Sequence, residues 1–170
     1  MRPFVLLGLC LFSSAVPAQV PEHYTMNRSH ITFVSVAPLE RIEASNSRST
    51  GLLDVLTRSF AVQIPMAGFE GFNSPLQREH FNENYLDSKI FPHATFAGRI
   101  IESIDLRVLG RYTVRAKGKL TIKGVERERI ISCELVVSEE GVHVASTFDV
   151  ALDEHGILIP RVVQQKVASV

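Results

Sequence analysis

The stretch Tyr112–Lys123, with the sequence YTVRAKGKLTIK, carries the clearest structural signal in this chain. Its even-numbered positions are apolar or small, whereas its odd-numbered positions are basic or carry a hydroxyl group. Such alternation with a period of two places one face of a strand on a hydrophobic core and the other face in water. The stretch therefore predicts a long, half-buried strand of an antiparallel sheet.

The same period continues on both sides of this stretch. Residues 60–66 and 142–152 repeat it, and further apolar runs predict the strands His30–Val36, Gly51–Leu56, Ala94–Ile101, Arg129–Val137 and Val162–Val170. Lys123-Gly124-Val125 and Glu139-Glu140-Gly141 are typical of hairpin turns. Only Pro75–Asp87 has helical spacing, with Ser74-Pro75 as its start signal. Seven or eight strands with tight turns predict an all-β antiparallel barrel or sandwich with one short helical insert.

The bulk composition excludes several classes of protein. Of the 170 residues, 45% are hydrophobic, and 18 basic residues balance 18 acidic ones. This apolar content is too high for a disordered chain, and two cysteines are too few for a disulfide scaffold. A net charge of zero argues against a nucleic-acid partner. The length suits one domain.

Residues 1–18 have the layout of a cleaved secretory signal peptide. Arg2 precedes the apolar run Phe4–Phe12, and Val16-Pro17-Ala18 supplies the small residues of a cleavage site. The run is shorter than the roughly 20 residues that cross a bilayer, and no later stretch approaches that length, so we expect no stable membrane insertion. We expect a mature domain of residues 19–170, in which Cys133 is the single remaining cysteine and a buried core residue.

Small residues recur on the predicted inward faces of the strands. They are Gly98, Ala116, Gly118, Cys133 and Ser146. A barrel of about eight strands is either filled by side chains or holds one small ligand. Small inward residues would leave an apolar space for such a ligand, unless neighbouring Phe and Met side chains fill it. Alternation alone leaves both interpretations open.

The common catalytic motifs are absent from the sequence. It has no G-x-S-x-G, H-E-x-x-H or C-x-x-C motif and no glycine-rich phosphate loop. His80 and Glu83 are three residues apart in the predicted helix, and with His93 or His30 as a third ligand they would form a metal site. The same two side chains are also the best-placed acid–base pair. The alternative is a polar helix face in water, with Phe81 packed beneath it.

A cationic series follows the central stretch. Its members are Arg115, Lys117, Lys119, Lys123, Arg127 and Arg129, which we expect on the outer face of the sheet. The simpler interpretation is a solvated face that is balanced by acidic residues elsewhere. The other interpretation is a docking site for an acidic partner or for a lipid head group.

Four local strings resemble the YceI-like proteins. Asn27–Phe33 (NRSHITF) is similar to the opening motif of that family, with the order of Ser29 and His30 reversed. Glu79–Tyr85 followed by Phe91–Phe96 resembles its F-(D/N)-x-x-x-(Y/F)-P-x-a-x-F segment. Gly118–Val125 resembles its G-x-L-T-I-x-G-V signature, the most specific of these first three strings. The fourth string resembles the C-terminal strand pattern and comprises Phe148–Leu152, Gly156, Ile157 and Pro160.

The resemblance implies an eight-stranded, antiparallel, lipocalin-like barrel that is secreted to the periplasm. It further implies that the barrel holds a long isoprenoid or other lipid-like chain, and it implies neither shared catalytic residues nor a cofactor. The leading hypothesis is therefore a non-enzymatic carrier of an apolar ligand. The candidate lining residues are Phe33, Phe60, Met66, Phe69, Phe72, Phe81, Tyr85, Phe96, Tyr112, Leu120 and Phe148.

Two other hypotheses remain beside the carrier. One is a metal- or haem-related periplasmic accessory protein that uses His80, Glu83 and His93. The other is a filled barrel that binds an acidic protein through its basic outer face. The sequence leaves the oligomeric state open, a dimer included.

Overall fold

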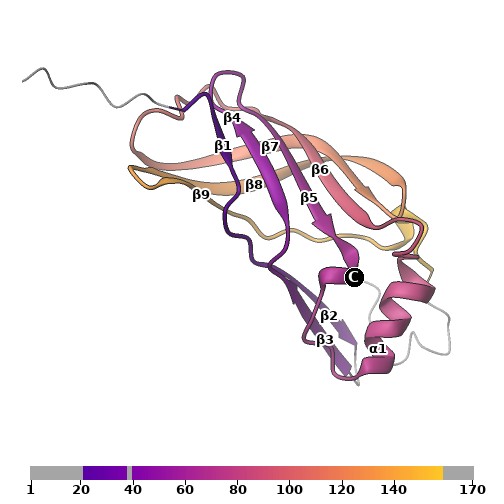
Figure 1. Cartoon of the computed structure of the whole chain (residues 1–170). Helices are drawn as coiled ribbons and strands as arrows, with labels where there is room; N and C mark the ends of the chain where they lie inside the picture. The colour runs from indigo at the N-terminus through magenta and orange to yellow at the C-terminus, as the bar shows by residue number, and fades with distance from the viewer. Residues whose placement is uncertain (1–20, 38–39, 159–170) are drawn as a thin grey trace, which may run out of the picture.

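The computed structural model of the chain describes residues 21–37 and 40–158. Most of these residues form a seven-stranded antiparallel sheet with the strand order β1-β4-β5-β6-β7-β8-β9. Its strands are β1 (His23–Thr25), β4 (Thr50–Asp54), β5 (Ser59–Pro65), β6 (His93–Ile100), β7 (Gly110–Ile122), β8 (Val125–Ser138) and β9 (Gly141–Ala145). The sheet curls into a nearly closed barrel (Figure 1), so the predicted antiparallel barrel with one short helix is confirmed.

A separate hairpin of β2 (Ile31–Ala37) and β3 (Glu40–Asn46) lies at one end of the barrel, beside the helical insert (Figure 1). The insert begins as predicted at α1 (Pro75–His80), because the Ser74 hydroxyl caps the helix by accepting a hydrogen bond from the Gln77 backbone N–H at 3.2 Å. It continues as the π-helical turn η2 (Phe81–Tyr85). Two short 3-10 turns, η1 (Met66–Gly68) and η3 (Asp153–His155), complete the described elements.

The strands β7 and β8 form one long hairpin, paired from Gly110↔Val137 to Ile122↔Val125. Its turn residues, Lys123 and Gly124, have φ angles of 50° and 74°. Positive φ at both central positions is the hallmark of a type I′ turn, whose twist matches that of the flanking strands. The predicted turn at this site is confirmed, and the turn at Gly141 is confirmed as the connection between β8 and β9.

The barrel contains two hydrophobic cores, one nearer to each of its ends. One core is formed mainly by the inward faces of β7 and β8 and contains Leu106, Val114 and Leu135. The other lies at the end that carries the hairpin and the helical insert, and contains Met66, Phe69 and Leu86. Cys133 is buried in the first core, as expected, and burial raises the pKa of its thiol.

The structure differs from the prediction in several strands. The prediction did not include β1 or β3. The strand predicted over residues 142–152 ends at Ala145, since the last pair that β9 forms with β8 is Glu134↔Ala145. Ser146 and Phe148 lie beyond the end of this strand and are exposed, although Ser146 forms a hydrogen bond with the buried Cys133 thiol. The predicted signal peptide (residues 1–18) and the predicted strand Val162–Val170 lie outside the described residues.

The inward glycines have a different role from the one that the sequence suggested. Gly98 and Gly118 are paired across β6 and β7. A Cβ atom at Gly98 would lie 2.0 Å from the Lys117 carbonyl oxygen, and one at Gly118 would lie 2.5 Å from the Ala97 carbonyl oxygen. Neighbouring backbone therefore occupies the place of both side chains, and these glycines permit close approach of two strands rather than widening the interior.

Candidate ligand-binding end of the barrel

Four phenylalanine rings meet at the end of the barrel beneath the β2–β3 hairpin. Phe33 of β2 stacks on Phe81 of η2, with ring centroids 5.2 Å apart and planes inclined by 4°. Phe69 contacts Phe33 at 5.4 Å and Phe81 at 5.7 Å, and Phe72 contacts them at 5.9 Å and 5.1 Å. We call these four residues the phenylalanine cluster. All four were predicted to line the ligand space.

The helical insert positions one side of the phenylalanine cluster. Phe81 and Tyr85 both lie in η2, a π-helical turn of a kind that is common at functional sites. The side-chain amide of Asn82 donates to the Arg78 carbonyl oxygen at 2.9 Å, and its oxygen accepts from the Ser88 hydroxyl at 2.8 Å. These bonds hold the turn in place, so that Phe81 and Tyr85 pack against the second core together with the predicted lining residue Met66.

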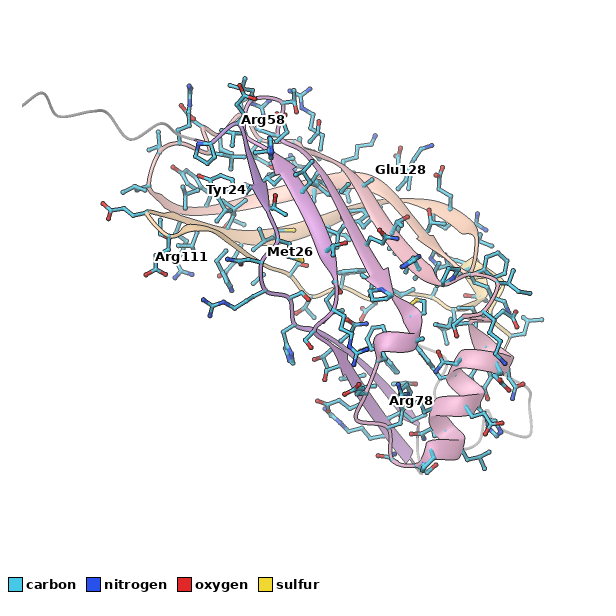
Figure 2. The ribbon with its side chains drawn as sticks, viewed as in Figure 1. Tyr24, Met26, Arg58, Arg78, Arg111 and Glu128 are labelled. Carbon is cyan, nitrogen blue, oxygen red and sulfur yellow. The ribbon has the colours of Figure 1, made fainter. Side chains whose placement is uncertain are left out.

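A hollow of about 600 Å³ opens at the surface next to this cluster. It includes Phe72 of the cluster, and the rest of its lining is largely polar: Glu70, Gly71, Asn73, Ser74, Pro75, Arg78, Glu79 and Asn82. Figure 2 shows Arg78, a residue of α1, at this end of the molecule. The Arg78 guanidinium donates to the Ala67 carbonyl oxygen at 3.2 Å, which links the insert to the segment that carries Phe69 and Phe72. The arrangement places apolar rings next to a polar, solvent-accessible rim.

The remaining predicted lining residues lie elsewhere. Phe60 and Phe96, with ring centroids 4.9 Å apart, pack against the first core, and so does Tyr112. Leu120 is buried on the inward face of β7, between the residues of the two cores. Phe148 is 44% exposed and makes no ring contact within the described residues. The structure thus gathers six of the candidates at one end of the barrel and spreads the others along it.

The structure does not assemble the predicted metal ligands. His80, Glu83 and His93 are all exposed, and the Glu83 carboxylate forms an ion pair with the Lys89 ammonium group at 2.6 Å. Within residues 21–37 and 40–158, no three His, Cys, Asp or Glu side chains are grouped closely enough to hold a metal ion. Spacing along one helix had placed the first two together but gave no information about a third ligand.

Most of the cationic series is paired with acidic residues. Lys117 pairs with Glu128 at 3.2 Å, Lys119 with Glu126 at 2.7 Å and Lys123 with Asp87 at 2.8 Å. This favours the interpretation as a solvated, charge-balanced face.

The prediction that all six cations project outward was wrong for the two on β8. In the register of the two strands, Arg129 of β8 lies opposite Gly118 of β7, and Gly118 belongs to the buried face of β7. A two-residue turn moves the inward face from even to odd positions, so Arg127 and Arg129 share the face of Ile131. Arg127 is nevertheless exposed near the turn, and the Arg129 guanidinium forms an ion pair with the Glu154 carboxylate.

The sequence did not point to the two most deeply buried polar residues of the described chain. Asn46, 1% exposed, ends β3 and donates to the Pro65 carbonyl oxygen at 2.7 Å. His155, 0% exposed, has its Nδ1 3.0 Å from the Val125 carbonyl oxygen. The Asp-Glu-His-Gly string at residues 153–156 is the only local signal for the second, since Gly156 ends η3 in the left-handed conformation.

The fold defines the class of the protein, a nearly closed antiparallel β-barrel with one short helix. The YceI-like domain matches residues 23–169 of the chain. The chain belongs to the YceI-like family.

Solved structures support the same fold. BcnA of Burkholderia cenocepacia is similar with a TM-score of 0.67 and 17% sequence identity, over 82% of this chain and 89% of BcnA. A polyisoprenoid-binding domain from Saccharophagus degradans, implicated in plant cell wall breakdown, is similar with a TM-score of 0.67 and 10% identity, over 80% of this chain and 81% of that domain. No curated protein matches the sequence. Within the described residues, no helix is long and apolar enough to cross a membrane.

Proposed function

We propose that this protein is a non-enzymatic, periplasmic carrier that binds one long apolar chain, of the isoprenoid or another lipid-like class, in its barrel. Membership of the YceI-like family supports this function, as does the similarity of its fold to a domain that binds polyisoprenoid. The observation that carries the proposal is the phenylalanine cluster at an end of the barrel where a hollow opens to solvent.

The energetics of such binding are those of apolar burial. Each Å² of hydrocarbon removed from water contributes about 25 cal/mol, so a long chain gains affinity from length rather than from particular contacts. Aromatic rings suit such a ligand, because they offer large, rigid apolar faces at a low cost in side-chain entropy. In this proposal the polar residues around the hollow, Arg78 and Glu79 among them, orient the polar end of the ligand at the rim.

Organic extraction of the purified protein, followed by mass spectrometry, tests the proposal. We expect a co-purifying lipid in the wild-type extract and a several-fold lower amount in Phe81→Ala, since Phe81 contacts each of the other three rings of the cluster. Leu76→Ala is the matched control, because Leu76 is a 58% exposed apolar residue of the neighbouring helix α1. A wild-type extract without lipid, together with no rise in melting temperature when long-chain isoprenoids are added, would reject the function.

A further inference from the structure

A second hollow, of about 500 Å³, lies on the outer surface of the sheet and is independent of the proposed lipid site. Its lining includes four cationic residues, Arg58, Arg99, Lys117 and Lys119, and a single acidic residue, Glu128. The rest of the lining is short or apolar, including the close pair Gly98 and Gly118. Figure 2 shows Arg58 and Glu128 on the side of the sheet away from Arg78 and the helical insert.

Arg58 has an unusual conformation for its place in the chain. It precedes β5 with a φ of 60°, in the left-handed region that non-glycine residues seldom adopt. Its carbonyl oxygen accepts a hydrogen bond from the Ile100 backbone N–H at 3.0 Å, which ties this turn to the end of β6. Its Nε atom is buried and has no hydrogen-bond partner among the described residues. Backbone strain and a buried, unsatisfied donor both oppose folding, and such features concentrate at functional sites.

The two lysines of the hollow form ion pairs with acidic residues, whereas its two arginines do not, within the described part of the chain. Lys117 pairs with Glu128 and Lys119 with Glu126. Within residues 21–37 and 40–158, neither Arg58 nor Arg99 forms an ion pair. The hollow therefore retains two uncompensated guanidinium groups, flanked by two ammonium groups.

We propose that this hollow binds a phosphate group, held by the guanidinium groups of Arg58 and Arg99. A guanidinium group offers paired N–H donors in the geometry that phosphate oxygens accept. The hollow is larger than a phosphate group needs, which leaves room for a second phosphate or for part of the molecule that carries it. The phosphate comes either from a free phosphate compound or from the head group of a lipid.

Titration of the purified protein with pyrophosphate in a low-salt, phosphate-free buffer tests this site. We expect the backbone amide NMR signals of Gly98, Arg99 and Gly118 to shift with a saturating profile. Arg99→Gln should weaken binding about tenfold, the loss expected for charge-assisted hydrogen bonds. Arg111→Gln is the matched control, because Arg111 is an exposed arginine of β7 that does not line the hollow and pairs with Glu134 at 3.2 Å.

Arg58→Gly separates a binding role from a structural one. Glycine adopts a φ of 60° without strain, so this variant should fold with unchanged or higher stability and still bind pyrophosphate about tenfold more weakly. Sedimentation with phosphatidylcholine vesicles, with and without phosphatidic acid, distinguishes the two sources of phosphate. Retention by phosphatidic acid alone would identify a lipid head group, and binding of pyrophosphate alone would identify a free compound. If neither probe binds, or if both arginine variants bind like the wild type, the site is refuted.

Discussion

At the scale of single residues, Gly98 shows how little space separates β6 from β7. A Cβ atom added there would lie 2.0 Å from the Lys117 carbonyl oxygen and 2.4 Å from the Gly118 Cα atom. Both are backbone atoms, which cannot move aside as the tip of a flexible side chain can. The pairing of two glycines across this ladder is therefore a requirement of the curled sheet, and it also forms part of the proposed phosphate-binding hollow.

We therefore expect Gly98→Ala to destabilise the fold by about 1–3 kcal/mol, the usual cost of overpacking. Chemical denaturation followed by circular dichroism measures this cost. Gly51→Ala is the control, since the nearest atom to its added Cβ would be the flexible Met26 Cε at 3.0 Å. Its cost should be clearly smaller, and equal midpoints for Gly98→Ala and the wild type would contradict the packing argument.

The residue patterns predicted which face of the sheet a side chain occupies better than they predicted its position along the barrel. Phe33, Phe60 and Phe81 were predicted as lining residues on equal terms, yet Phe60 belongs to the other core. Period-two alternation states which side of the sheet a residue faces, but it does not state its height in the barrel. That height depends on strand register and on the β2–β3 hairpin, which brings Phe33 and Phe81 together across a long separation in sequence.

At the scale of elements, the β7–β8 hairpin was predictable and β3 was not. The hairpin has long, unbroken alternation and a turn whose glycine suits a positive φ. In β3, with the sequence ERIEASN, the buried positions are Ile42, Ala44 and Asn46, of which only the first is a large apolar residue. The metal hypothesis had a similar weakness, because helical spacing specifies neighbours within one helix but no ligand from another element.

One carboxylate, that of Glu102, attaches the segment between β6 and β7 to strand β7. Glu102 accepts hydrogen bonds from the Arg115 backbone N–H at 2.7 Å and from the Arg115 side-chain Nε at 2.8 Å. The backbone hydrogen bond, followed by the side-chain one, holds the pKa of Glu102 below its ordinary value of 4.5. A lowered pKa in the folded state means that this stabilisation is complete above about pH 4.5 and is lost as the pH falls through the folded-state pKa.

We expect Glu102→Gln to lower the urea midpoint at pH 7, and the difference from the wild type to shrink at pH 3. Urea denaturation at the two pH values measures both effects. Glu140→Gln should show neither, since Glu140 is exposed and has no hydrogen bond or ion pair within the described residues. If the urea midpoint of Glu102→Gln were lower than that of the wild type by the same amount at pH 7 and pH 3, the charge of Glu102 would not contribute to the stability.

At the scale of the whole molecule, the sheet has two edge strands, which are shorter than its central strands β7 and β8 and have fewer ladder partners. β1 has three residues and pairs only with β4, while β9 has five residues and pairs only with β8. Neither edge strand has a second ladder partner among the described residues. Val144 of β9 lies opposite the buried Leu135 and is itself 52% exposed.

This arrangement predicts a gradient of local stability around the barrel. Amide hydrogens of β6, β7 and β8 should exchange most slowly, because each of these strands is paired on both sides, at least along part of its length, and packs on a core. Those of β1 and β9 should exchange orders of magnitude faster, since fraying there breaks one ladder and uncovers few buried side chains. Hydrogen–deuterium exchange with mass spectrometry resolves these segments. Protection of β1 or β9 equal to that of β7 would contradict the gradient and would require a further strand or a partner on that edge.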